Sequence, residues 1–348
     1  MIISKTPFRI SFFGGGTDYP EYFTRHSGAV LGTAIDKFCY VSATRLYSKL
    51  FDYTIRLAYR QVECVRDLDS IQHAPFRECL RTAGITGGIE VDYMAELPSS
   101  TGLGTSSSFV VGVLNTLSAV CGELVHPLDL AYRAIDLERN VLNEAVGCQD
   151  QTLAAVGGFN LVEFHGVDDI RVHRLGLDAQ RLAEFNAHLM LIYTGIRRRA
   201  SDVAAKQIKK IDRNVTHLAG MRKLVDEGYE LLTGRGSLAG FGQMLHDAWT
   251  LKHQLDAGVS NQQINEMYET GLANGAWGGK LLGAGGGGFL LFFAPPERQA
   301  AIREAFADFE EIPIAINAAG TRIIHAEHSG FANTESPETE VPAIKRAA

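Results

Sequence analysis

Three glycine-rich segments, each beside carboxylate, hydroxyl or basic side chains, carry most of the residue types in this sequence that suit chemistry. They read FFGGGTDYP at 12–20, LPSSTGLGTSSSFVVGVL at 97–114 and GGKLLGAGGGGFLLFF at 278–293. Glycine adopts positive φ without strain and lets a ligand approach the backbone closely. The segments therefore predict loops that surround a ligand.

The first segment places Asp18 directly after Gly14, Gly15 and Gly16, at the end of an alternating strand. A carboxylate at such a strand end can bind the hydroxyl groups of a ligand. A simple turn capped by the aspartate is the alternative, and the residues alone leave both interpretations open.

The second segment favours a phosphate site. Glycines and small hydroxyl residues lead straight into an amphipathic helix, whose free N–H groups and positive dipole end attract an anion. Ser106, Ser107 and Ser108 fall in its first turn, where hydroxyls can contact phosphate oxygens or a bound Mg²⁺. An ordinary helix cap needs only one such residue.

The third segment excludes two common nucleotide folds. Gly283, Gly285 and Gly288 satisfy G-x-G-x-x-G, but a strand follows the loop where a dinucleotide fold has a helix. The Walker pattern fails because Asn274 replaces its first glycine and Leu281 follows Lys280 in place of Ser or Thr. A second backbone surface close to a ligand is the remaining prediction.

Two carboxylates lie between the second and third segments. Glu138 falls in the apolar stripe of the helix expected over 127–143, where it needs a metal ion or an arginine as partner. Asp150 either caps the short helix after it or serves as base or orienting group for a hydroxyl nucleophile. Both pairs of alternatives stay open.

Arg197, Arg198 and Arg199 follow a buried strand and precede a helix whose expected N-cap is Ser201. Guanidinium groups beside a helix N-terminus suit a phosphate or a carboxylate. A solvated basic run is the alternative.

The elements that must position these residues change from strands to helices along the chain. Strands are predicted at 8–12, 29–47, 53–66, 88–97, 157–166, 188–195, 289–293, 312–316 and 321–326, and helices from 106 onward and at 127–143, 201–232, 236–256, 261–274 and 297–309. This order predicts an α+β fold with a division near 165–185 and a loose tail at 332–348.

Composition restricts the function classes. The 348 residues include 33 Lys and Arg against 40 Asp and Glu, a formal charge of −7, which argues against nucleic-acid and anionic-membrane partners. The five cysteines show no metal-like spacing, so free thiols are expected. The sequence begins without a charged and apolar leader and holds no apolar tract long enough to cross a bilayer, so we expect a cytoplasmic protein.

Together the segments resemble the GHMP kinases, the superfamily of galacto-, homoserine, mevalonate and phosphomevalonate kinases. TPFRISFFGGGTDYP, PSSTGLGTSSSF and KLLGAGGGGF are similar to the three family motifs and occur in the family order. The resemblance implies a ribosomal-protein-S5-like N-terminal domain at 1–175 and a ferredoxin-like C-terminal domain at 176–331, with the active site in the cleft between them.

The resemblance also implies roles for single residues. Glu138 resembles the family's Mg²⁺-binding glutamate and Asp150 its base or orienting aspartate, while Arg9 would stabilise charge on the transferring phosphoryl group and Asp18 would contact sugar hydroxyls. Ser106 matches the serine that contacts Mg²⁺ and phosphate, with Ser107 as the alternative. The phosphates of ATP would lie on the second motif, at Ser99, Ser100, Gly102, Gly104, Thr105, Ser106, Ser107 and Ser108.

The form of the first motif is similar to the sugar-kinase branch, and within it to the heptose 7-phosphate kinases, with fucose kinase-like proteins nearby. Gly15 and Gly16 replace the Glu-His of galactokinases, which argues against galactose. Arg197 and Arg199 have no counterpart in the general pattern, and a substrate that already carries a phosphate would give them a role. Gly285 and Gly286 would shape the substrate side.

These motifs predict transfer from MgATP to the anomeric 1-OH of a heptose 7-phosphate. The alternatives are a kinase of an unphosphorylated sugar such as L-fucose, and a non-catalytic protein that senses sugar or nucleotide on the same fold. A homodimer stays open.

Overall fold

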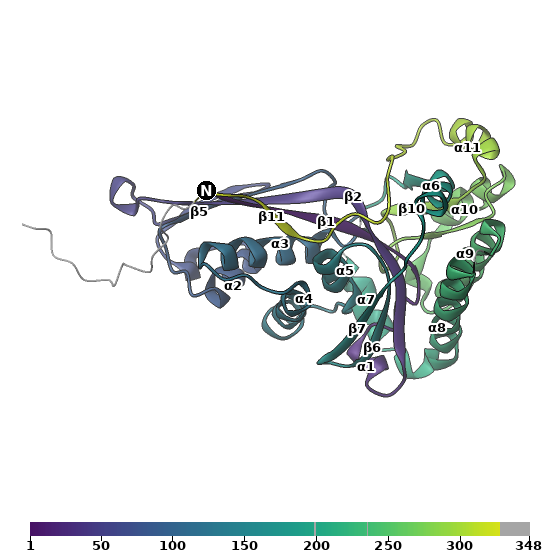
Figure 1. Cartoon of the computed structure of the whole chain (residues 1–348), viewed down its shortest axis with the longest axis horizontal. Helices are drawn as coiled ribbons and strands as arrows, with labels where there is room; N and C mark the ends of the chain where they lie inside the picture. The colour runs from purple at the N-terminus through teal and green to yellow at the C-terminus, as the bar shows by residue number, and fades with distance from the viewer. Residues whose placement is uncertain (198–199, 235, 328–348) are drawn as a thin grey trace, which may run out of the picture.

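The computed structural model of this chain describes residues 1–197, 200–234 and 236–327, with only the backbone at 200–202. The described part forms two sheets, one of eight strands and one of three. Figure 1 shows the larger sheet and its helices at one end of the elongated molecule, and the helices that cover the smaller sheet at the other. The predicted α+β class is confirmed.

The larger sheet is organised around one long strand, β2 (Gly28–Arg45). β1 (Ile2–Phe13) runs antiparallel along it, β5 (Ile89–Ala95) pairs with its second half, and β6 (Phe159–Gly166) pairs with its first. The remaining strands extend the edges: β3 (Ile55–Ala58), β4 (Val62–Val65), β7 (Asp169–Arg174) and β11 (Arg322–Ala326).

Helix α3 (Thr105–Val120) is the central helix of this unit, and it packs against β1 and β2. Thirteen of its residues are buried, so it is apolar nearly all round, as a core helix must be. Around it lie α2 (Ala74–Thr82), α4 (Pro127–Asp136), a π-helical turn (Leu137–Val141) and α5 (Gln149–Val156). The short α1 (Pro20–Phe23) follows the first glycine loop.

The smaller sheet has the order β8 (Leu189–Tyr193), β10 (Phe289–Phe293) and β9 (Gly278–Leu281), all antiparallel. Its helices are α6 (Ala179–Ala187), α7 (Ala200–Ile208), α8 (Ile211–Thr233), α9 (Leu238–His253), α10 (Gln262–Ala273) and α11 (Gln299–Ala305). Buried aromatic rings join the two units: Phe12 contacts Phe185 and Phe241 edge-on, and Phe293 packs beside both.

Most predicted elements are confirmed, and several are wrong in their bounds. The expected strand over 53–66 is a pair of short strands, β3 and β4, and the helix expected over 201–232 is interrupted between α7 and α8. Residues 312–316 form no strand within the described chain, only an isolated bridge from Ile316 to Ile35. Helices α2 and α6 and strand β7 were not predicted, although α2 carries Phe76, Cys79 and Leu80 at helical spacing and β7 alternates at Ile170 and Val172.

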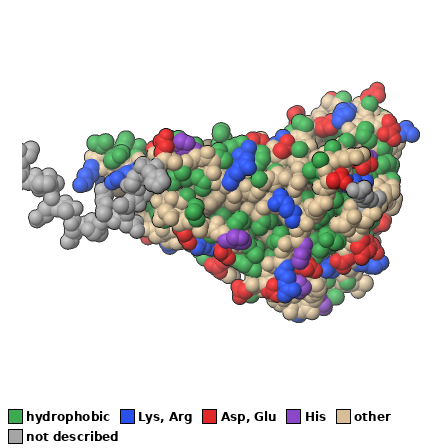
Figure 2. Space-filling view, viewed as in Figure 1, with side chains coloured by type: hydrophobic (Ala, Val, Ile, Leu, Met, Phe, Trp, Pro, Cys, Tyr) green, Lys and Arg blue, Asp and Glu red, His purple; other side chains and the backbone are tan. Residues whose placement is uncertain are grey.

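The last strand returns to the first sheet, where β11 pairs with the start of β1. The division between 175 and 176 stays a prediction, and the expected loose tail at 332–348 lies outside the described residues. All five cysteines are free. In the described part of the chain no helix is long and apolar enough to span a membrane. Side chains of both charges are interspersed on the face in Figure 2.

Candidate active site between the glycine loops

A pocket of about 470 Å³ lies where the three glycine loops meet. Gly15, Gly16 and Asp18 line it from the first loop, residues 99–107 from the second, and Gly283 and Ala284 from the third. Segments up to 270 positions apart in sequence thus surround one space, as the glycine pattern predicted.

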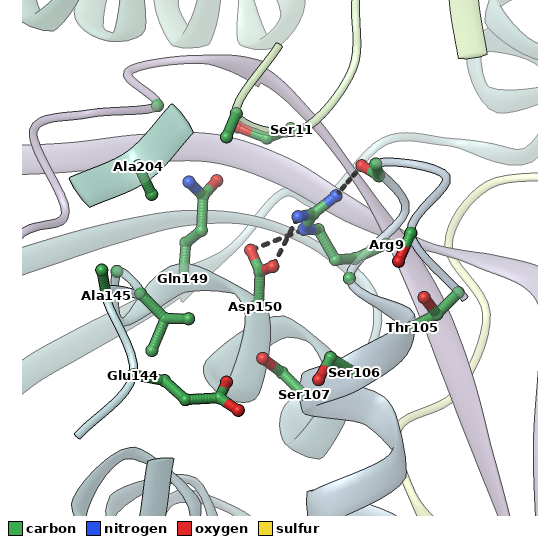
Figure 3. A pocket seen from close by; sticks show the side chains of 18 of the residues that line it. Arg9, Ser11, Thr105, Ser106, Ser107, Glu144, Ala145, Gln149, Asp150 and Ala204 are labelled. Carbon is green, nitrogen blue, oxygen red and sulfur yellow. Dashed lines mark hydrogen bonds and ion pairs between the residues drawn. The ribbon is translucent and has the colours of Figure 1, made fainter. Parts of the chain in front are cut away.

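Arg9 and Asp150 form an ion pair in this pocket, drawn in Figure 3. The Arg9 side chain on β1 donates from Nε to Asp150 Oδ1 over 2.7 Å and from Nη2 to Oδ2 over 2.5 Å. Its Nη1 donates to the carbonyl of Gly102 over 2.6 Å, so the guanidinium also fixes the second loop. A two-point guanidinium–carboxylate contact holds both groups in one orientation.

Asp150 is not the cap of its helix. The N-cap of α5 is Cys148, which makes no side-chain cap bond, and Asp150 lies inside the first turn with its carboxylate turned to Arg9. Its side chain is 25% exposed, into the pocket. The geometry excludes the cap, and the role of Asp150 toward a hydroxyl nucleophile stays a prediction.

Glu138 lies in the π-helical turn and is fully buried. Ser107 Oγ donates to its carboxylate over 2.9 and 3.1 Å, and Gln151 Nε2 donates as well. Burial raises the pKa of Glu138 to about 8. The hydrogen bonds from Gln151 and Ser107 favour the charged carboxylate and act against this shift, but they are the smaller effect. Among the described residues no basic side chain pairs with it, so the arginine partner is excluded there.

Glu138 does not itself line the pocket; its carboxylate contacts Ser107, which does. Mg²⁺ is commonly held by one or two carboxylates together with substrate phosphates and water, and no cluster of three or more acidic, His or Cys side chains in the described chain could hold a metal by itself. Ser107 touches Glu138 directly, while Ser106 is exposed and faces the pocket. The metal site stays a prediction, with Ser107 the nearer of the two serines to Glu138.

Asp18 is buried beside the start of α5 and accepts hydrogen bonds from two backbone amides. Gly16 N donates over 2.9 Å and Gln149 N over 3.3 Å. Burial raises the pKa of Asp18, and the negative charge of Asp150 raises it further. Gly147 is required beside it, because a Cβ at that position would lie 1.9 Å from Asp18 Oδ2.

The other predicted residues divide into two groups. Seven residues of the second loop line the pocket: Ser99, Ser100, Gly102, Gly104, Thr105, Ser106 and Ser107. Ser108 does not, since its hydroxyl donates to the carbonyl of Pro7 over 2.9 Å.

On the substrate side, Gly285 and Gly286 pack against the backbone of Val259 and do not line the pocket, whereas Gly283 and Ala284 do. Arg197 is exposed after β8 and is not among the described lining residues. Arg199 lies outside the described residues.

Several residues that line the pocket were not predicted from the sequence, and four of them carry polar groups placed in it. Lys252 on α9 and Lys280 on β9 are buried and line the pocket, and Ser11 and Gln149 each have a buried oxygen without a hydrogen-bond partner. Lys280 is the first residue of the third motif, which is a usable signal, whereas Lys252 lies in a helix outside all three motifs. Aromatic residues that line the pocket, including Tyr59, Tyr93 and Phe109, were assigned no role in the site.

Comparison with known families agrees with this geometry. Residues 72–158 match the model of the GHMP kinases N terminal domain and residues 229–311 that of the GHMP kinases C terminal domain. The chain belongs to the GHMP kinase superfamily, a class of phosphotransferases, and has its two-domain fold.

Individual relatives were also found. The chain is 27% identical to the D-glycero-alpha-D-manno-heptose 7-phosphate kinase of Campylobacter jejuni, over 82% of this chain and 86% of that protein. It is 26% identical to the L-fucokinase/L-fucose-1-P guanylyltransferase of Bacteroides fragilis, over 87% of this chain and 35% of that protein.

Solved structures share the fold. A D-glycero-D-manno-heptose 1-phosphate kinase from Bacteroides thetaiotaomicron matches with a TM-score of 0.77 at 20% identity, over 94% of this chain and all of that one. The galactokinase of Lactococcus lactis, solved with galactose, matches with a TM-score of 0.71 at 16% identity, over 92% and 94% of the two chains. At these identities the likeness concerns the fold alone.

Proposed function

We propose that this protein is an ATP-dependent sugar kinase that phosphorylates the anomeric 1-OH of D-glycero-D-manno-heptose 7-phosphate. The observation that carries the kinase assignment is the Arg9–Asp150 pair, which lies between a loop suited to phosphates and a buried aspartate suited to hydroxyl groups. The heptose assignment rests on the similarity to the Campylobacter jejuni enzyme.

The second loop would bind the phosphates of ATP. The N-terminus of α3 and the residues of 99–107 present backbone N–H groups and hydroxyls toward the pocket, and Gly104 at the N-cap has a φ of +71°, which glycine adopts freely. Glu138 with Ser107 or Ser106 would hold Mg²⁺. When bound, that ion offsets the negative charge of the phosphates.

The acceptor sugar would lie on the side of Asp18 and Gln149. Asp18 would accept hydrogen bonds from sugar hydroxyls, and Asp150 would orient the reacting hydroxyl and accept its proton. The new bond joins that oxygen to the γ-phosphorus, the bond to the bridging oxygen of ADP breaks, and Arg9 offsets charge on the transferring group. Ser, Cys and Lys side chains are not needed as covalent nucleophiles, so direct in-line transfer is proposed.

A second candidate is a kinase of an unphosphorylated sugar such as L-fucose, which the fucokinase similarity favours. The position of Arg197 also favours it, since that residue is exposed outside the described pocket lining. In that case replacement of Arg197 or Arg199 leaves the KM for sugar unchanged. A non-catalytic sensing protein is the third reading, and the combination of Glu138 and Asp150 argues against it, because binding alone needs neither.

A coupled ADP-release assay with MgATP tests these candidates. The substrates compared are heptose 7-phosphate, free heptose, L-fucose and galactose, with Asp150→Asn as the inactive control. Turnover with heptose 7-phosphate alone supports the proposal. Turnover with a free sugar supports the kinase mechanism but replaces heptose 7-phosphate as the proposed substrate. Turnover with none of the four sugars contradicts the sugar-kinase assignment.

A further inference from the structure

Two buried lysines in the pocket have no part in the mechanism above. Lys252 on α9 is 7% exposed and Lys280 on β9 is 4% exposed, and both line the pocket. A buried ammonium group is costly unless it is paired, so each needs a physical reason to be there.

Their protein contacts are backbone carbonyls only. Lys280 Nζ donates to the carbonyls of Ser11 and Phe12 over 2.9 and 2.7 Å, and Lys252 Nζ donates to those of Leu281 and Gly283. An ammonium group has three N–H donors. These contacts use two on each lysine, and within the described chain no carboxylate forms an ion pair with either.

Neither lysine has an acidic partner in the described chain, and other basic groups lie near both. Burial is the largest cause that lowers the pKa of each lysine; the charge of Arg9 adds to it for Lys252, and the charges of Lys252 and then Arg9 add to it for Lys280. Arg9 is already paired with Asp150, which leaves the two lysines without a counter-charge. Such a cluster is suited to an anion from a ligand.

Ser11 gives an independent indication. Ser11 is 9% exposed, and its buried Oγ has no hydrogen-bond partner. Its backbone carbonyl accepts a hydrogen bond from Lys280. Ser11 Oγ and Gln149 Nε2 both lie within 4 Å of where a Cβ on Gly15 would be, so the hydroxyl faces the same space as the first glycine loop. Figure 3 shows Ser11 and Gln149 on the pocket beside the Arg9–Asp150 pair.

We propose that Lys252, Lys280 and Ser11 Oγ form an anion site that binds the γ-phosphoryl group of the nucleotide next to Arg9. The inference rests on the proposed kinase function and adds to it three residues that have no role in the mechanism above: Ser11 in the first motif, Lys280 at the start of the third, and Lys252, which lies in none of the three. A phosphate carried by the sugar has the same chemistry, and the experiment separates the two sources.

The test compares ligands that differ by one phosphate. The affinities of ADP and AMP-PNP, each with Mg²⁺, are measured by titration calorimetry on the wild type and on Lys252→Met, Ser11→Ala and the surface control Lys223→Met. Loss of a charge-assisted bond is expected to weaken AMP-PNP binding by about tenfold or more in Lys252→Met, with ADP changed by less than about threefold. Ser11→Ala should act in the same direction, and Lys252→Arg should restore part of the effect.

Three results would overturn the proposal. Equal weakening of ADP and AMP-PNP means that Lys252 only supports the third loop. Unchanged affinity for both means that the lysine binds no phosphate. Weaker binding of heptose 7-phosphate but not of free heptose, with the nucleotides unaffected, assigns the anion to the sugar. The titrations of ADP and AMP-PNP contain no sugar. Their results can therefore be interpreted even if heptose 7-phosphate is not the substrate. Ser11→Ala keeps the test valid should Lys252→Met fail to fold.

Discussion

Ser107 Oγ lies 2.9 and 3.1 Å from the two carboxylate oxygens of Glu138. Among the described residues, Glu138 forms no ion pair with a basic side chain. The hydroxyl comes from the first turn of the helix that follows the second glycine loop, and the carboxylate from a π-helical turn more than thirty residues later. One glycine loop and one buried acid therefore meet, and Ser107 joins that contact to the pocket, which Glu138 itself does not line.

Glu138→Gln should raise the Mg²⁺ concentration needed for half-maximal activity by about tenfold or more, because the amide keeps the shape of the carboxylate but not its charge. Ser107→Ala and Ser106→Ala, measured in the same Mg²⁺ titration, decide between the two serines. We expect the larger shift for Ser107→Ala. An unaltered Mg²⁺ dependence in Glu138→Gln would remove this residue from the metal site.

Asp150→Asn should lower kcat by about 10²–10⁴-fold, since the amide cannot accept the hydroxyl proton. AMP-PNP affinity should change little, because Asp150 contacts Arg9 and not the phosphate loop. Steady-state kinetics and nucleotide titration on the same preparation check both statements. Near-wild-type turnover in this variant is incompatible with the proposed role.

Gly104→Ala should lower activity by about tenfold or more, because a Cβ there would lie 3.0 Å from Arg9 Cγ and displace the guanidinium. Gly122→Ala is the matched control: its φ is +77°, close to the +71° of Gly104, but a Cβ would meet no atom within 4 Å. Both variants carry the same backbone strain of about 1–2 kcal/mol. Equal activity in the two would show that Arg9 tolerates displacement.

Gln149→Ala should raise the KM for sugar by about tenfold at unchanged KM for ATP, because its unpartnered Oε1 and its amide face the acceptor side of the pocket. Gln243→Ala, an exposed glutamine on α9, serves as the control. A rise in the KM for ATP instead would place Gln149 on the nucleotide side.

Stability should rise with pH above neutrality through the buried lysines. The pKa of Lys252 falls from its ordinary 10.5 to about 7 in the folded chain, so between those values the unfolded chain binds more protons than the folded one. Lys280, with its pKa also lowered, acts in the same direction.

The raised pKa values of Glu138 and of the buried thiols Cys79 and Cys148 act in the opposite direction, so the quantity to measure is a difference. The free energy of unfolding of ligand-free wild type minus that of Lys252→Met, measured by denaturant titration from pH 7 to 10, should increase with pH. An identical pH profile in wild type and variant contradicts the lowered pKa of Lys252.

The sequence patterns located the three loops because glycine runs beside hydroxyl and acidic residues are readable without knowledge of the fold. They also identified Glu138, whose position in an apolar stripe conflicts with its charge. The ion pair between Arg9 and Asp150 could not be derived from spacing, since it joins the first strand to a helix 141 positions later. Only the family resemblance placed both residues at one site.

Other parts of the site lie beyond any local pattern. Lys252 points inward from a helix that is amphipathic by sequence, and its partners are carbonyls, which every residue possesses. Ser108 was assigned to the nucleotide with its neighbours, yet its hydroxyl is turned to Pro7 because adjacent helical residues face different directions. In both cases the direction in which the side chain points depends on how its helix packs in the fold, which a local sequence pattern does not contain.

The pairing of β11 with β1 also constrains how the pocket can open. The chain leaves the larger sheet after β7, builds the smaller sheet and its helices, and returns at β11, where Ile2 pairs with Ala326 (Figure 1). The C-terminal unit is therefore tethered at two crossings, before α6 and after α11. A movement of this unit relative to the larger sheet would bend both crossings together, which favours rotation about one shared axis and resists twisting of one unit against the other.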